Sequence, residues 1–114
     1  PDDPALSLNW GLQKIRAPEA WLRQKGRQDV IVAVIDTGCD VFHPSLSSNI
    51  WKNPGESGLD ENGFSRASNG YDDDNNGFVD DIYGWNFVNN SPDVQDEHGH
   101  GTHIAGIIGG KALR

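Results

Sequence analysis

The chain has 114 residues, a formal net charge of −8, a hydrophobic content of 35% and a single cysteine, Cys39. This length allows one domain with a modest core, and one cysteine excludes an internal disulfide. The acidic balance argues against a nucleic-acid partner, because phosphate contacts require Lys and Arg. No apolar run approaches the roughly 20 residues of a membrane-spanning helix, so no membrane partner is expected either.

The pattern of apolar residues and breakers predicts two helices and two strands. A first helix is expected over roughly residues 18–25, which begin with Pro and are followed by Gly. Residues 30–35 form a continuous apolar run rich in β-branched side chains, which favours a central parallel strand covered on both faces. A short strand is expected over 82–87, and a second helix begins at His100. This order of elements predicts an α/β sandwich with a mostly parallel sheet.

Asp36 directly follows the predicted strand over 30–35, in the sequence Val-Ile-Asp-Thr-Gly. Functional groups of open α/β sheets gather at the carboxyl ends of strands, so Asp36 is a candidate catalytic residue. An Asp that only caps a turn would fit the same position. Asp-Thr-Gly is also the aspartic-protease signature, in which two carboxylates of a homodimer share one proton. The motif alone leaves these three interpretations open.

A cluster of three histidines, His98, His100 and His103, invites a zinc interpretation. A helix that begins at His100 would place His103 on the same face and leave His98 outside the helix. Metallo-β-lactamase-like hydrolases carry Asp just before the third histidine of a related cluster, whereas this chain has Thr102. The pattern therefore argues against zinc and favours an ordinary polar role for His98 and His103.

Taken together, the two motifs resemble those of the subtilisin-like serine proteases (subtilases, peptidase S8). The resemblance rests on Val-Ala-Val-Ile-Asp-Thr-Gly-Cys-Asp at 32–40 and on Gly-His-Gly-Thr-His-Ile-Ala-Gly at 99–106. The acid precedes the base along the chain, an order shared with subtilisin, whose nucleophilic serine follows far downstream. The resemblance implies a serine endopeptidase in which Asp36 is the relay aspartate and His100 the relay histidine.

The same resemblance implies the rest of the expected architecture. Residues 1–114 would be the N-terminal portion of the catalytic domain, a three-layer sandwich with a mostly parallel sheet that is incomplete in this chain. The partners would be the remainder of that domain and a polypeptide substrate, and the protein would be secreted. In many subtilases a calcium ligand, Asp, stands where this chain has Ser45, so that particular calcium site is not expected. Cys39 is expected to be a small packing residue rather than a reactive thiol.

The chemistry of the relay requires a nucleophile that this chain does not show. A serine hydroxyl becomes a good nucleophile when a base takes its proton, and His100 would do this while Asp36 holds the other ring nitrogen. The family's Gly-Thr-Ser-x-Ala motif does not occur in the sequence, and its eight serines all stand in other contexts. The 114 residues alone are therefore expected to hydrolyse no peptide.

A polar, acidic loop is expected over about residues 52–81, where eight acidic side chains stand against two basic ones. From Asp72 onward the sequence matches an EF-type calcium loop at positions 1, 3, 5, 6, 7 and 9, but position 12 holds Tyr83 rather than Glu. A structural calcium ion and a solvated acidic turn without a cation both fit this pattern. A calcium-stabilised acidic module without chemistry is thus the alternative to the protease. The candidate calcium ligands are Asp72, Asp74, Asn76, the carbonyl oxygen of Phe78, and Asp80.

Overall fold

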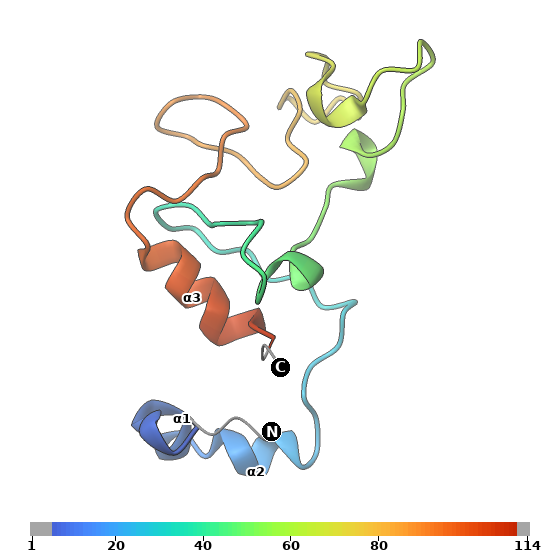
Figure 1. Cartoon of the computed structure of the whole chain (residues 1–114). Coiled ribbons are helices and arrows are strands. Elements are labelled where there is room, and N and C mark those ends of the chain that lie inside the picture. The colour runs from blue at the N-terminus through green and yellow to red at the C-terminus, as the bar shows by residue number, and fades with distance from the viewer. Residues whose placement is uncertain (1–5, 112–114) are drawn as a thin grey trace. The chain divides into compact units, whose positions relative to one another are not determined.

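A computed structural model describes residues 6–111 of the chain. The chain divides into two compact units, Pro1–Val32 and Ala33–Arg114, and each is described by itself. Within residues 6–111, helices and turns are the regular structure, and no strand ladder forms (Figure 1).

The first unit contains a 3₁₀ helix, η1 (Leu6–Leu8), and two short α-helices, α1 (Trp10–Lys14) and α2 (Ala17–Trp21). The Asn9 side chain caps α1 by accepting a hydrogen bond from the Leu12 N–H at 3.4 Å. The helix predicted over 18–25 is shorter than expected. It ends at Trp21, and a few residues further on the Gln24 side chain accepts the N–H groups of Lys25 and Gly26 in place of a helical carbonyl.

The strand predicted over 30–35 does not form among the described residues. The run is uncovered in this structure, and Ile35 is 94% exposed. A strand gains its stability from hydrogen bonds to neighbouring strands and from packing on its faces, and the described residues supply neither. The strand predicted over 82–87 is likewise replaced by one isolated bridge between Asn86 and Ser91, because the Asn86 side chain accepts the next N–H groups and turns the chain.

The second unit is built around helix α3 (His100–Gly109), which begins at the predicted residue. Segment 40–50 is joined to both ends of α3 (Figure 1). Near the start of the helix, the Asp40 N–H donates to Thr102 Oγ1 at 2.9 Å. At its end, the Asn49 side-chain amide in η2 (Ser47–Asn49) donates to the Gly109 carbonyl at 2.8 Å. The buried side chains of Val41 and Leu46 form a small apolar centre beside the helix.

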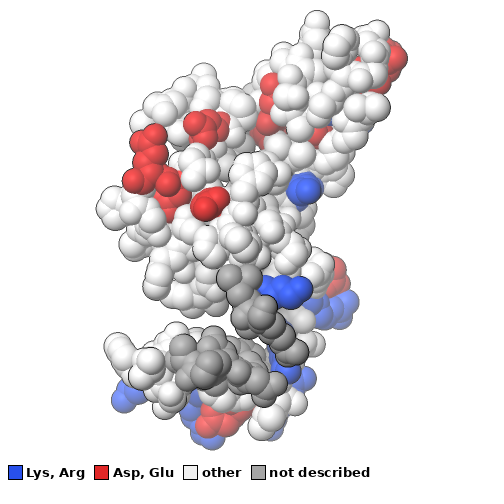
Figure 2. All heavy atoms as spheres, in the orientation of Figure 1, with Lys and Arg blue, Asp and Glu red and all other residues white. Residues whose placement is uncertain are grey.

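The acidic segment 52–81 is ordered by hydrogen bonds rather than by an apolar core. It contains two 3₁₀ helices, η3 (Pro54–Glu56) and η4 (Arg66–Ser68). Its turns close on carboxylates, as where Asp60 Oδ1 accepts the N–H groups of Asn62 and Phe64. On the face that Figure 2 shows, acidic side chains outnumber basic ones over the second unit. No helix in the described part of the chain is long and apolar enough to cross a membrane.

Candidate active site

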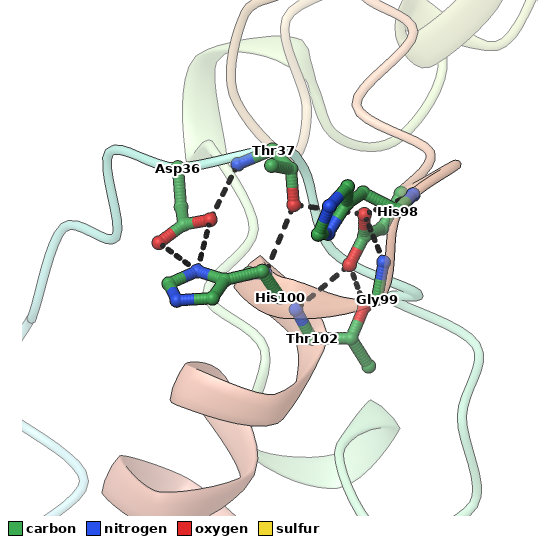
Figure 3. Close-up of polar contacts among 8 residues, drawn as sticks. Asp36, Thr37, His98, Gly99, His100 and Thr102 are labelled. Atoms are coloured by element: carbon green, nitrogen blue, oxygen red, sulfur yellow. Dashed lines mark hydrogen bonds and ion pairs between the residues drawn. The ribbon is translucent and has the colours of Figure 1, made fainter.

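The structure brings Asp36 and His100 together across 64 positions of sequence. His100 Nδ1 lies 2.8 Å from Asp36 Oδ1 and 2.9 Å from Oδ2 (Figure 3). Asp36 follows the apolar run 30–35, and His100 is the first residue of α3. The Asp36 side chain is 16% exposed while the imidazole is 59% exposed. The pair is therefore open on the histidine side, where a reacting group could approach.

The surroundings of Asp36 favour its ionised form. The backbone N–H of Thr37 donates to Asp36 Oδ1 at 2.7 Å. This bond, followed by the bond from His100, holds the pKa of the Asp36 carboxyl below its ordinary value. An ionised carboxylate only accepts hydrogen bonds, so the shared proton belongs to Nδ1 of His100. This tautomer leaves Nε2 as the basic nitrogen of the imidazole.

The absence of a side chain at Gly101 allows the segment that carries Asp36 to lie close to the start of α3. Gly101 is buried, and a β-carbon there would overlap the carbonyl oxygen of Gly38 and lie 3.2 Å from the Asp36 Cβ. Gly38 itself has φ +119°, and a β-carbon there would lie 2.6 Å from the Val94 carbonyl oxygen. Gly101 therefore lets the backbone after Asp36 lie directly against the start of α3, and Gly38 lets the same backbone lie against segment 94–96.

Asp96 is a site residue that the sequence analysis missed. It stands just before α3, and each of its carboxylate oxygens accepts hydrogen bonds from this region. The N–H of Gly99, the hydroxyl of Thr102 and further N–H donors hold the pKa of Asp96 far below its ordinary value. An acidic residue just before a predicted helix start was the available signal, because such residues accept the free N–H groups of the first turn.

In the part of the chain that the structure describes, His98, His103 and Cys39 belong to no group of three or more ligand atoms that lie close together. The rings of His98 and His100 are 6.4 Å apart between centroids. Among the described residues, no group of histidine ligand atoms is close enough to hold a zinc ion. Cys39 is partly buried, and burial, followed by the nearby carboxylates, raises the pKa of its thiol. This agrees with a packing role, because the reactive form of cysteine is the thiolate.

The acidic segment brings together a different set of carboxylates from the one predicted. Ligand oxygens of Glu56, Asp74 and Asp81 all lie within 4.8 Å of one another. The Asn53 amide donates to Asp74 Oδ2 at 2.9 Å and to Asp81 Oδ1 at 3.0 Å, which holds these two carboxylates side by side. Glu56 is fully buried, and its Oε2 has no hydrogen-bond partner. Burial and then the neighbouring acids raise the pKa of Glu56.

Of the five ligands predicted for an EF-type loop, only Asp74 belongs to this acidic cluster (Glu56, Asp74 and Asp81). Asp80 has φ +57°, and its carboxylate accepts the N–H of Gly70 at 3.1 Å. Asp72 accepts the N–H groups of Asn76 and Gly77, and Asn76 Oδ1 accepts the N–H of Phe78. These oxygens close turns of their own segment. The cluster therefore draws on η3, which the EF-type loop does not include, and on Asp81, which in a shortened loop would take the place of the missing twelfth ligand.

An ionised carboxylate that holds the Nδ1–H of an exposed imidazole is the arrangement of acid and base in serine hydrolases. Comparison with known proteins agrees with that class, because the model of the subtilase family (peptidase S8) matches residues 27–113. The chain belongs to the subtilase family. Membership implies the α/β subtilisin fold, although the sheet of that fold is not formed by residues 6–111.

Several curated relatives match almost the whole chain. Subtilisin-like protease 1 of Plasmodium berghei (strain Anka) is 42% identical over 113 residues, and its namesake in Plasmodium vivax is 44% identical over 113 residues. Each match covers 94% of this chain but only 17% and 16% of the respective relative. Thermitase of Thermoactinomyces vulgaris is 32% identical over 108 residues, which cover 27% of that protein. The chain thus spans a minor part of the length of these relatives.

The close approach at Gly101 can be tested by filling it. Gly101→Ala should lower the free energy of unfolding by about 1–3 kcal/mol, because the new methyl group forces the segment after Asp36 away from α3. Gly106→Ala in the same helix is the matched control, since no described atom lies within 4 Å of its β-carbon position. The control should be neutral or stabilising by up to about 1 kcal/mol. Equal urea midpoints for both variants would contradict the packing described.

Proposed function

We propose that this chain supplies the acid and the base of a serine endopeptidase. The observation that carries the proposal is the Asp36–His100 pair, with Nδ1 at 2.8 Å and 2.9 Å from the two carboxylate oxygens, in a chain of the subtilase family. The substrate class is a polypeptide. The nucleophilic serine and the oxyanion donor are proposed to come from the remainder of the catalytic domain, of which residues 1–114 form the N-terminal portion.

The geometry supports the following sequence of proton transfers. Nε2 of His100 takes the proton of the serine hydroxyl as its oxygen attacks the peptide carbonyl carbon. The imidazolium that results is stabilised by the ionised Asp36, which keeps its own charge. The imidazolium then gives the proton to the leaving amine, and the acyl group stays on the serine. Water next attacks this acyl-enzyme, while His100 takes a proton from the water and returns it to the serine oxygen. Asp36 therefore serves to fix the tautomer and orientation of His100, and His100 moves the proton.

The exposed apolar run 30–35 supports the proposed place of this chain in a larger domain. Four of its side chains, Val30, Ile31, Val32 and Ile35, are more than half exposed here. Leaving such side chains in water forgoes roughly 1.5–3 kcal/mol each. In the remainder of the domain, flanking strands would supply the missing ladder and helices on the two faces would cover these side chains, which would make 30–35 the central parallel strand of the three-layer sandwich.

The alternatives of the sequence analysis are less well supported. An aspartic protease needs Asp36 to share a proton with a second carboxylate, whereas Asp36 is engaged by the imidazole of His100. A purely structural acidic module gives no reason for an exposed imidazole that is hydrogen-bonded to the less exposed carboxylate of Asp36.

Secretion stays a prediction from the family resemblance. The names of the relatives do not all agree with it, because one of them is a protein named major intracellular serine protease, from Bacillus subtilis (strain 168), 33% identical over 98 residues.

We also propose a structural calcium site at the acidic cluster. The support is the fully buried Glu56, whose Oε2 has no partner and which lies among two more carboxylates. Three such groups repel one another, and a divalent cation would offset this repulsion and fill the acceptor capacity of Glu56. Asp74 is kept from the predicted ligand set, and Glu56 and Asp81 replace Asp72, Asn76, Phe78 and Asp80.

The relay is tested in the full-length protein. His100→Ala should lower kcat by about 10⁶ and Asp36→Asn by about 10⁴, since loss of the base or of its orienting acid costs about this much in subtilisin-type triads. Hydrolysis of a labelled peptide measures both. His103→Gln is the matched control, because this exposed histidine of the same helix should leave turnover largely unchanged. Absence of peptidase activity in the wild-type full-length protein would refute the proposed function.

The missing nucleophile predicts a second outcome. A fluorophosphonate probe should label the full-length protein on a serine outside this chain and should not label the isolated 114 residues, because a base without its serine forms no adduct. Gel fluorescence after equal exposure compares the two. Labelling of the isolated chain, lost in His100→Ala, would show that one of its own serines is the nucleophile.

Calorimetry distinguishes the two calcium ligand sets, namely the acidic cluster and the EF-type loop. Glu56→Gln should weaken calcium binding by about a factor of ten or more, because affinity in such sites follows the number of charged ligands. Asp80→Asn is the matched control: it removes one carboxylate from the same segment but none from the cluster. The reverse order of effects would favour the EF-type register, and absence of calcium heat in the wild-type protein would refute both.

A further inference from the structure

Asp96 collects five hydrogen bonds on its two oxygens. Its Oδ1 accepts the Thr37 hydroxyl at 2.9 Å and the N–H groups of His98 and Gly99 at 2.9 Å and 2.8 Å. Its Oδ2 accepts both the N–H and the hydroxyl of Thr102, at 2.9 Å and 2.7 Å. This one carboxylate therefore joins the segment that follows Asp36 to the first turn of the helix that begins with His100.

Thr37 is the link between Asp96 and the acid of the relay. Its hydroxyl donates to Asp96 and accepts the N–H of Gly101 at 3.0 Å. Its backbone N–H donates to Asp36 Oδ1 at 2.7 Å. The Thr37 hydroxyl has one proton, which it donates to the carboxylate of Asp96. Its oxygen can therefore accept the N–H of Gly101. The lone pair that receives the Gly101 N–H is thereby kept in place.

The Asp36–His100 bond needs such support because it is open to water. The imidazole is 59% exposed, and an exposed pair of this kind contributes little to holding two segments together. The two residues are 64 positions apart, so the chain itself does not fix their distance. Of the ties through Asp96 and Thr37, those at Gly101 and Thr102 are partly buried, whereas the Thr37–Asp96 bond itself is exposed. They fix the approach of the two segments without touching the reacting nitrogen.

We propose that Asp96 is a positioning residue of the relay, which acts through Thr37 and the start of α3 to hold Asp36 and His100 in register. This inference rests on the proposed function of the pair. Asp96 does not contact the His100 ring or the Asp36 carboxylate through any hydrogen bond described. The competing account is that Asp96 only caps α3 through His98, Gly99 and Thr102, in which case the Thr37 contact would be incidental.

A double-mutant cycle in the full-length protein distinguishes these accounts. Thr37→Val removes the hydroxyl while keeping the shape of the side chain, and Asp96→Ala removes the acceptor. Each should lower peptide kcat by about 10², with KM nearly unchanged, since a misplacement of about 1 Å costs this much. The double variant should be no slower than Asp96→Ala alone. Multiplied losses in the double variant, or a normal kcat in folded Asp96→Ala, would overturn the proposal.

Thr102→Val is the comparison variant: it removes a hydroxyl that donates to Asp96 from the helix side and also accepts the N–H of Asp40, but it leaves the Thr37 bond in place. Its effect should be smaller than that of Thr37→Val. If Thr102→Val is the slower variant, the tie through Thr37 is not the one that positions the pair, and the proposal is overturned. Should Asp96→Ala fail to fold by circular dichroism, Thr37→Val against Thr102→Val decides alone.

A spectroscopic readout keeps this test separate from the proposed function. The Nδ1 proton between His100 and Asp36 should give a low-field ¹H resonance in the wild-type protein, assigned by its loss in His100→Ala. It should broaden or disappear in Asp96→Ala and Thr37→Val, and persist in Thr102→Val. If the wild-type protein proves inactive, the proposed function fails while this resonance still tests the positioning role. An unchanged resonance in both variants, or none in the wild type, would overturn it.

Discussion

The second unit depends on one constraint: the backbone after Asp36 must lie directly against the first turn of α3. Gly101 supplies the room, because a β-carbon there would overlap the carbonyl oxygen of Gly38. Once the two segments meet, the carboxylate reaches the imidazole at 2.8 Å. The same approach lets Asp40 donate its N–H to Thr102 Oγ1 at 2.9 Å. The histidine orientation is thus a consequence of backbone packing, and the Asp36–His100 bond completes an arrangement that other contacts hold.

Carboxylates organise most of this unit in place of apolar side chains. The buried hydrophobic residues are few among those described, namely Val41 and Leu46. Asp60 and Asp96 each accept several backbone N–H groups and close the chain around themselves. Such bonds satisfy the donors of irregular segments, which would otherwise remain unpaired. A chain with this construction can hold a precise site on loops, provided that the carboxylates stay ionised.

Sequence reasoning succeeded where the determinants are local. The start of α3 and the meeting of its first residue with Asp36 follow from two short motifs. The strand predicted over 30–35 is not formed among the described residues and stays a prediction, because pairing partners decide whether an apolar run becomes a strand. Sequence reasoning missed Asp96, whose partners come from two segments, Thr37 and residues 98–102. The calcium ligands were assigned along one register of the chain, whereas η3 brings Glu56 to Asp74 through space.

The two kinds of carboxylate respond to pH in opposite directions. Asp36 and Asp96 have pKa values below their ordinary ones because N–H groups and a hydroxyl or imidazole donate to them. Their contribution to stability is present above the ordinary Asp pKa and is lost as the pH falls through the lowered values. Glu56 has a raised pKa through burial, so its contribution is present in acid and is lost as the pH rises through the raised value. Near neutral pH Asp36 and Asp96 are therefore ionised and contribute in full, whereas ionisation of the buried Glu56 works against the stability of the acidic cluster. A cation bound there would remove this conflict, since it favours the ionised form of Glu56 under the same conditions that keep Asp36 ionised.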